Sequence, residues 1–214
     1  MAAIYFPSCN FTKASPRAAK RLRDYMKERM PVAGCCRVDN TPYPAGDKAL
    51  YFCQACRETL EAKEGNQLLL ENLFVWLDRQ EDFPWPDYSG LVVNVQDCWR
   101  DRKHSEIFQA VRSCLGKMRV QVREMEENRE RSVFCGNLHF EPHLPENIAL
   151  VNARPGVPLY DFPEEEQAQL FAEQAAKYTA PLAVTYCNRC TAGISLGGWK
   201  AVHLMELAME TYLE

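Results

Sequence analysis

The sequence predicts an α/β fold of two tandem, pseudo-repeated modules, each with a small, largely parallel sheet and metal-binding loops at the strand ends. Short apolar runs rich in β-forming residues alternate along the chain with helical patterns, and this order is typical of parallel sheets. The order strand, cysteine, helix, glycine-flanked cysteine, strand and Cys-x-x-Cys also occurs twice. We predict a first module over residues 1–86 and a second over residues 87–214, with the proline- and aromatic-rich residues 83–90 as the connector.

The first module is predicted to contain two strands, each leading to a cysteine, and two helices. Its predicted elements are strands over residues 2–6 and 49–52 and helices over residues 15–30 and 57–80. Ser15 and Pro16 mark the first helix start, because serine is a favoured N-cap and proline a favoured first helical residue. Apolar residues at helical spacing from Leu69 to Leu77 indicate the second helix, with a break near Gly65.

The second module is predicted to repeat this order with one more strand and one more helix. Its predicted elements are strands over residues 91–95, 119–124 and 181–186 and helices over residues 105–116, 163–178 and 199–213. Residues 142–158 begin and end with proline, and we predict a loop there. Two glycines, Gly197 and Gly198, precede the last predicted helix.

Nine of the ten cysteines fall into two groups that follow predicted strand ends or flank glycine. The first group is Cys9, Cys35, Cys36, Cys53 and Cys56, and the second group is Cys98, Cys135, Cys187 and Cys190. Because ligands of parallel α/β folds gather at the carboxyl ends of the strands, we expect each group to converge. The tenth, Cys114, lies among apolar residues of a predicted helix and is interpreted as a packed core thiol.

The composition favours a globular protein with reduced thiols. A hydrophobic content of 47% permits a packed core, and no apolar run approaches the roughly 18 to 20 residues of a membrane span. No signal-peptide pattern opens the sequence, so we expect a cytoplasmic protein, where clustered cysteines bind metals more often than they form disulfides.

The charge pattern gives no reason to expect a nucleic-acid partner, since the formal net charge is -4. Basic residues gather once, in residues 13–23. Because Asp24 and Glu28 follow on the same predicted helix, we interpret this cluster as a solvated helix face in preference to a docking patch.

The spacing of the first group resembles the cysteine-rich (CCG) domain of heterodisulfide reductase B-like proteins. There are 25 residues between Cys9 and Cys35 and 16 between Cys36 and Cys53, before the Cys-x-x-Cys pair. Residues 5–9 (YFPSC), 97–100 (DCWR) and 200–207 (KAVHLMEL) are also similar to that family. The resemblance covers nearly the whole chain, with two such modules in tandem.

The resemblance implies a non-cubane [4Fe-4S] cluster bound by the five thiolates of the first group. It implies that a small thiol or disulfide substrate reacts at Cys35 and Cys36, and that the second group binds a second cluster. It also implies electron-donor subunits, either ferredoxin-like or flavoprotein. The chain itself shows no nucleotide-binding glycine loop.

The chain departs from the family pattern at three points. Phe134 stands where the family has the first cysteine of its pair, which leaves four thiols in the second group. Four thiolates suit a cubane [4Fe-4S] cluster or a Zn²⁺ ion equally well. Arg37 replaces the glycine that usually follows the cysteine pair, and the segment between Cys36 and Cys53 is shorter than in the family. His139, four residues after Cys135, is the histidine to consider as a substitute ligand.

Two functions fit the pattern. One is a redox enzyme or enzyme subunit that acts on a thiol or disulfide at the first cluster, and the other is a non-catalytic electron-transfer or metal-stabilised scaffold subunit. A substrate-sized cavity beside Cys35 and Cys36 would favour the first function, and closed, fully ligated sites would favour the second. The arginines next to ligand cysteines, which either offset cluster charge or lie on the surface, are Arg37, Arg57, Arg100 and Arg189.

Overall fold

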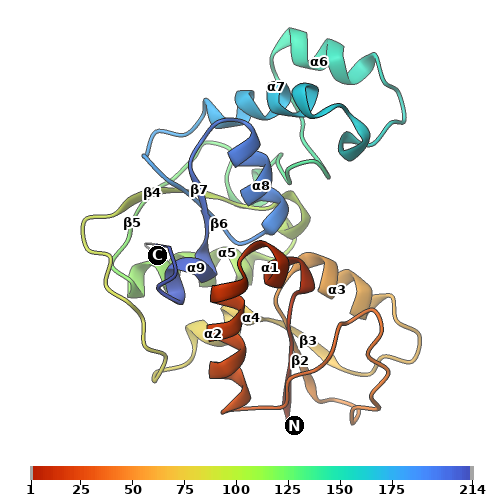
Figure 1. Ribbon diagram of the computed structural model, residues 1–214, viewed down its shortest axis with the longest axis vertical. Coiled ribbons are helices and arrows are strands. Elements are labelled where there is room, and N and C mark those ends of the chain that lie inside the picture. Colours follow the sequence, from red (N-terminus) through yellow and green to blue (C-terminus); the bar gives the residue numbers. More distant parts are fainter. Residues whose placement is uncertain (1, 213–214) are drawn as a thin grey trace.

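The computed structural model describes residues 2–212 and contains two parallel β-sheets with helices packed around them (Figure 1). The first sheet has the strand order β1-β2-β3, with β1 at Ala3–Phe6, β2 at Lys48–Tyr51 and β3 at Leu69–Asn72. The second has the order β5-β4-β6-β7, with β4 at Val92–Gln96, β5 at Gln121–Arg123, β6 at Ala183–Thr185 and β7 at Ala201–His203. All pairings of these strands are parallel, which confirms the predicted α/β class with small parallel sheets.

The helices connect the strands and cover the sheets. They are α1 (Cys9–Ala14), α2 (Pro16–Lys27), α3 (Gln54–Glu61), α4 (Leu73–Asp78), α5 (Ser105–Lys117), α6 (Pro145–Asn152), α7 (Glu164–Ala175), α8 (Asn188–Leu196) and α9 (Leu204–Ala208), with short 3-10 turns η1 (Trp99–Asp101), η2 (Arg129–Arg131) and η3 (Leu159–Asp161). Helix α2 begins at Pro16 as predicted, and its buried side is Ala18, Leu22 and Met26. Figure 1 shows α6 and α7 at the end of the molecule away from the first sheet.

Four strands end two or three residues before a cysteine, and each of these cysteines begins a helix or a 3-10 turn. Cys9 is the first residue of α1, while Cys53, Cys98 and Cys187 are the N-cap residues of α3, η1 and α8. Backbone N–H groups at a helix start point toward the cap and stabilise negative charge there. This strand-to-helix geometry therefore places these cysteines at the carboxyl ends of the strands, where parallel α/β folds build their binding sites.

The predicted helix over residues 57–80 is confirmed at its two ends and at the break near Gly65, but it is wrong at residues 69–72. Helix α3 ends at Glu61, Gly65 turns the chain with φ +73°, and residues 69–72 form β3 beside β2. The Asn72 side chain then accepts a hydrogen bond from the Phe74 backbone N–H and begins α4. Parallel pairing with β2 satisfies the backbone of Leu69 and its neighbours, and this tertiary contact overrides the helical spacing of their apolar residues.

Two further predictions are wrong for related reasons. Residues 145–152, predicted as a loop, form α6 because Pro145 occupies the first turn, where proline is tolerated. Residues 201–203, predicted as helix, form β7, which pairs with β6 through Val184 and Val202. The last helix starts only after His203, whose ring accepts from the Met205 N–H, while Glu206 completes the capping box.

Both sheets contribute to one continuous hydrophobic core. The buried His203 ring, at the end of β7, stacks on Phe52 with ring centroids 5.3 Å apart and lies 4.7 Å from Phe11. In the connector, the Phe83 ring packs edge-on against Tyr25 at 5.0 Å. The boundary at residues 86 and 87 stays a prediction, but its neighbourhood is packed and not a loose linker.

Within residues 2–212, no helix is both long enough and apolar enough to span a bilayer.

Candidate metal centre

The second cysteine group converges on a single point. The Sγ atoms of Cys98, Cys135, Cys187 and Cys190 all lie within 4.8 Å of one another, and all four residues are buried. The Cys135 Sγ is 3.4 Å from the Cys98 Sγ and 3.9 Å from the Cys187 Sγ. Across residues 2–212, no other cluster of three or more cysteine, histidine or acidic side chains is this compact. The site can therefore hold a metal ion or an iron–sulfur cluster.

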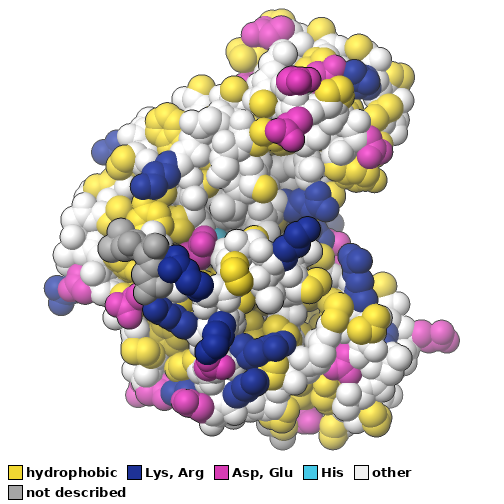
Figure 2. Space-filling view, in the orientation of Figure 1, with side chains coloured by type: hydrophobic (Ala, Val, Ile, Leu, Met, Phe, Trp, Pro, Cys, Tyr) yellow, Lys and Arg dark blue, Asp and Glu magenta, His cyan; other side chains and the backbone are white. Residues whose placement is uncertain are grey.

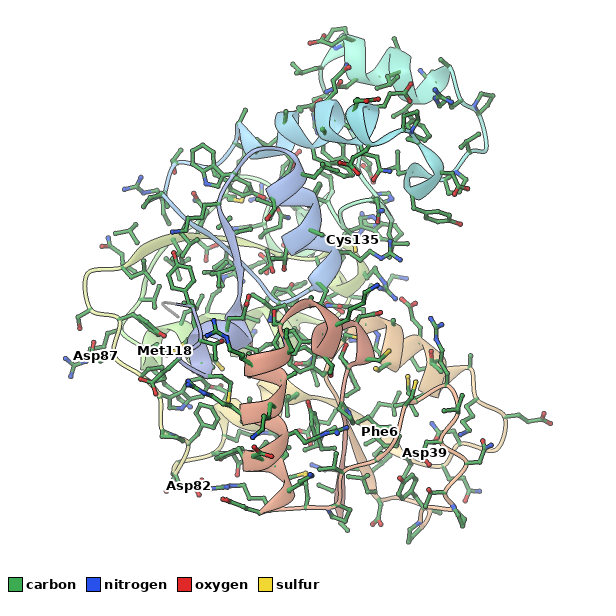
Figure 3. All side chains as sticks on the ribbon, in the orientation of Figure 1. Phe6, Asp39, Asp82, Asp87, Met118 and Cys135 are labelled. Carbon is green, nitrogen blue, oxygen red and sulfur yellow. The ribbon has the colours of Figure 1, made fainter. Side chains whose placement is uncertain are left out.

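Two strand ends and one tight loop deliver these thiols. Cys98 follows β4, and Cys187 and Cys190 follow β6 on the first turn of α8, three residues apart and so on one face. Cys135 comes from the loop before α6, where its N–H donates to the His139 carbonyl at 2.7 Å. Figure 3 labels Cys135 beside α8.

Gly136 fixes this loop against α8. Its φ is +53°, and a Cβ at this position would lie 2.1 Å from the Arg189 carbonyl oxygen. Only glycine combines this backbone conformation with so close an approach. The glycine next to Cys135 therefore lets the loop reach the strand-end cysteines.

Phe134 closes the four-thiol site on one side. Its ring is fully buried and packs edge-on against Phe140 at 5.6 Å and Phe171 at 5.5 Å. Its carbonyl oxygen lies 3.8 Å from the Cys190 Sγ. Phe134 is thus an aromatic core residue at the position where the resemblance has a further cysteine.

The thiols of this site differ in pKa. Hydrogen bonds from Cys135, Cys190 and Cys98 hold the pKa of Cys187 well below its usual value, because they stabilise its thiolate. Burial raises the pKa of Cys98 and of Cys190 well above that value. Cys187 is therefore the thiol of this site that ionises most readily, and binding of a metal would release the thiol protons.

The first cysteine group is brought together only in part. Cys36, Cys53 and Cys56 are buried, and the Cys53 Sγ lies 3.5 Å from the Cys56 Sγ. Burial raises the pKa of Cys36, and the nearby Cys56 thiol acts in the opposite direction. Cys35 is half-buried, and Cys9 is exposed at the start of α1. Three predicted ligands are thus buried, two of them with their sulfurs in contact, and the trio is less compact than the four-thiol site. The other two ligands lie at more accessible positions.

The trio contains one acidic thiol. Hydrogen bonds from the Cys56 thiol, and further from the Ser8 side chain, lower the pKa of Cys53 to about 6. The pKa of its partner Cys56 is raised by the same bond and by burial. Cys53 is also the N-cap residue of α3, and of the three buried thiols it is the one that ionises most readily.

A cavity of about 850 Å³ opens between the two cysteine groups. Cys36 and Cys53 line it from the first group, and Cys187 lines it from the second. Four basic side chains and a single acidic one also line it: Arg37, Lys63, Arg100, Arg189 and Glu58. Figure 2 shows lysine and arginine side chains at the hollow between the two parts of the molecule. The cavity is therefore electropositive, with thiols of both groups in its walls.

The arginines beside the cysteines differ in their roles. Arg57 is buried and bonds Asp101, and Arg100 bonds Glu58 across the cavity wall. Arg189 donates to the Asn137 side chain at 2.5 Å. Of these residues, Arg57 and Arg100 connect the two halves and are not ordinary surface residues.

His139 is not part of the four-thiol cluster, so its role as a substitute ligand is wrong. Its ring stacks on Trp99 with centroids 3.8 Å apart, and its Nε2 pairs with Glu141 at 2.8 Å. The buried Cys114, with its Sγ 3.9 Å from the Phe74 carbonyl, is the core thiol that its neighbours indicate.

Sequence reasoning missed Gln54 and Asp101, which bond each other between the two cysteine groups. Their one signal in the sequence is position, since Gln54 follows Cys53 directly and Asp101 lies three residues after Cys98.

No protein-family model matches the chain, and neither a curated protein nor a solved structure matches it. The geometry of the cysteines and the cavity is therefore the basis for a functional proposal.

Proposed function

We propose that this chain is a metal–thiolate redox protein of the heterodisulfide reductase B type. In this proposal the four-thiol site holds a structural Zn²⁺ ion, and the first cysteine group holds an iron–sulfur cluster that faces a thiol or disulfide substrate. The observation that carries the proposal is the cavity of about 850 Å³ lined by Cys36, Cys53 and Cys187.

The sulfur spacing supports zinc at the four-thiol site. The Sγ–Sγ distances of 3.4 Å and 3.9 Å there bracket the value of about 3.8 Å that follows from tetrahedral Zn–S bonds of about 2.3 Å. In a cubane cluster each thiolate binds a different iron, so the four sulfurs must lie farther apart. Full burial and the Phe134 wall leave no open coordination position, as expected for a structural site.

The partly exposed first cysteine group suits a cluster that a substrate can reach better than a fully enclosed metal ion. Cys36, Cys53 and Cys56 would hold the cluster from the buried side, with Cys9 and Cys35 as the outer ligands. When bound, such a cluster supplies one-electron transfers and an iron that accepts a substrate sulfur. Arg37 and Lys63 on the cavity wall would offset its negative charge.

The size and charge of the cavity support a small anionic substrate. Its volume lies within the range of about 300 to 1,000 Å³ that is typical of small-molecule sites. Four cations against one carboxylate favour a thiol or disulfide that carries carboxylate or phosphate groups. Reduction of a disulfide consumes two electrons and two protons and yields two thiols, and a separate donor protein would supply the electrons.

The second candidate is a non-catalytic electron-transfer or scaffold subunit. It is favoured by the four-thiol site, which is fully buried and offers nothing to a substrate except at Cys187. The two candidates differ at the first group, because only the enzyme needs a cluster that a substrate can reach.

Metal analysis of anaerobically purified protein tests the proposal. We expect one zinc and about four irons with matching sulfide per chain. The variant Cys36→Ser is expected to lose or convert the iron cluster and keep zinc. With an excess of a reduced ferredoxin as electron donor, the wild type is expected to cleave a small anionic disulfide, with two electrons and two protons consumed per disulfide. Eight irons without zinc would contradict the zinc assignment, and absence of iron would contradict the redox function.

A further inference from the structure

Basic side chains gather on the exposed face of α1 and α2. The cations of residues 13–27 are Lys13, Arg17, Lys20, Arg21, Arg23 and Lys27, and all six are exposed. The one acid in this segment is Asp24, so the segment carries a net charge of +5, and the rest of the chain carries -9 to give the total of -4. Figure 2 shows dark blue side chains grouped over the position of these two helices in Figure 1. We call these six residues the α1–α2 basic face.

The two acids that follow this cluster in the sequence offset little of its charge. Asp24 pairs with Lys20 at 2.7 Å, while Glu28 pairs with Arg29, which lies outside the face. The interpretation of the cluster as a solvated helix face was based on these two acids. Of their two ion pairs, only the one with Lys20 involves a cation of the basic face.

The fold uses only part of this charge. Arg21 donates to the Met209 and Glu210 carbonyl oxygens and so joins α2 to the residues after α9, while the buried side of α2 is formed by apolar residues. An exposed cluster of like charges costs some self-repulsion and contributes little to stability. A binding role accounts for the exposed charge that takes no part in the fold.

The basic face adjoins the first cysteine group. Helix α1 begins at Cys9, and Lys13 lies one turn further along the same helix, so the two exposed side chains are neighbours. Asn10, between them, lines the cavity. A protein bound to this face would therefore sit at the edge of the cavity and next to the most accessible thiol of the first group.

The chemistry of the face favours an acidic protein over other polyanions. None of the exposed large hydrophobic residues lies on α1 or α2, so this part of the described chain offers nothing to insert into a lipid surface. The charge of -9 on the remaining residues would repel a nucleic acid that extends beyond the two helices. A compact acidic surface matches the size and sign of the patch.

We propose that the α1–α2 basic face docks an acidic electron-donor protein and that electrons enter the first metal site beside Cys9. This inference rests on the proposed function. In each encounter the reduced iron–sulfur centre of the donor loses one electron, and the centre held by the first cysteine group gains it. Two such encounters supply the two electrons that one disulfide requires.

Stopped-flow reduction of the metal-loaded protein by a reduced acidic ferredoxin tests the docking face. The variant Lys20→Glu/Arg23→Glu changes the net charge by -4 within the face. The control Lys103→Glu/Arg131→Glu makes the same change at two exposed residues elsewhere. We expect the second-order rate constant at low salt to fall at least about tenfold in the first variant and less than about twofold in the control, because steering depends on local charge.

Two further readouts separate docking from metal loading. The wild-type rate should fall steeply as salt rises, while the rate of the first variant should depend on salt only weakly. Reduction by dithionite, which needs no protein docking, should proceed at the same rate in all three proteins.

An unchanged ferredoxin rate and salt dependence in Lys20→Glu/Arg23→Glu would overturn the docking face and leave the proposed function intact. A metal-loaded protein without any reducible centre would overturn both. A single-stranded 20-mer oligonucleotide serves as the competing probe. If it bound more tightly than the ferredoxin and lost affinity in the same variant, the face would be a nucleic-acid site and the inference would be wrong.

Discussion

Arg57 and Asp101 form a buried ion pair that joins the helix after Cys53 to the 3-10 turn after Cys98. The Arg57 Nη1 lies 2.5 Å from the Asp101 Oδ1, and the second guanidinium nitrogen donates to the Arg100 carbonyl at 2.8 Å. The Gln54 Nε2 donates to the other Asp101 oxygen at 2.5 Å. Both ionic partners are almost fully buried, so the two cysteine groups are held together by charges that have no access to water.

Removing the Asp101 charge should destabilise the protein strongly. The variant Asp101→Asn removes the buried counter-charge of Arg57 and leaves it only the half-exposed Glu61, 3.9 Å from its Nε. We expect a loss of about 3 to 5 kcal/mol in the free energy of unfolding. Urea unfolding followed by circular dichroism measures the change. The control is Asp87→Asn, which breaks the exposed ion pair with Arg119 and should change the free energy of unfolding much less. If both variants lowered the free energy of unfolding by the same amount, the buried ion pair would contribute no more to stability than the exposed one.

Gly136→Ala should weaken the four-thiol site. The added Cβ would collide with the Arg189 carbonyl in a backbone conformation that alanine rarely adopts. We expect zinc affinity, measured by chelator competition, to fall at least about tenfold. The matched control is Gly156→Ala, where φ is also positive at +76° but nothing lies within 4 Å of the added carbon. If the Gly136 variant bound zinc as tightly as the control, Gly136 would not be needed to hold the loop against α8.

Cys190→Ser should abolish tight zinc binding and lower stability, because a structural zinc site contributes its binding energy to folding. The expected readouts are zinc loss in elemental analysis and a lower thermal unfolding midpoint. Cys114→Ser removes an equally buried thiol that lies outside both cysteine groups, and it should keep full zinc content. Zinc retained at full occupancy in the Cys190 variant would be incompatible with the four-thiol site.

Glu173 should make the contact between α6 and α7 sensitive to acid. Burial acts to raise the pKa of this carboxyl, but hydrogen bonds from the Asn147 side chain and from the backbone N–H of His143 lower it below its usual value of 4.5. A depressed folded-state pKa contributes stability above pH 4.5 that is lost as the pH falls through the folded pKa. Hydrogen exchange in α6 should therefore accelerate below pH 4.5 in the wild type, relative to Glu173→Gln. Parallel pH profiles of the two proteins would contradict this role.

The cysteine pattern allowed the parallel sheets and the four-thiol site to be predicted, since strand-ending cysteines such as Cys98 and Cys187 mark the carboxyl edge of a sheet. Local periodicity failed at residues 69–72 and 201–203. There the decisive contacts are with strands that lie far away in the sequence. The choice between strand and helix at such short apolar segments depends on tertiary pairing that no local pattern contains.

The ligand residues could be predicted from the sequence, but their arrangement in space could not. Spacing alone does not show that Cys9 is exposed while Cys36 is buried, because that difference depends on how α1 leaves the first strand. It also gives no signal for the ion pair between Arg57 and Asp101, whose partners are 44 residues apart. Electrostatic contacts between residues far apart in the sequence can be recognised only once the positions of both elements in the three-dimensional structure are known.

The packing of His203 against Phe52 and Phe11 determines how the two halves of the chain behave when separated. Each of these rings would be exposed to water in a fragment that ends or starts at the connector, so neither fragment should remain dispersed by itself. Co-expressed as residues 1–86 and 87–214, the pieces should instead reassemble as a split protein. The gene could then be divided at this point to report, through reconstitution, on proteins that bring the two fragments together.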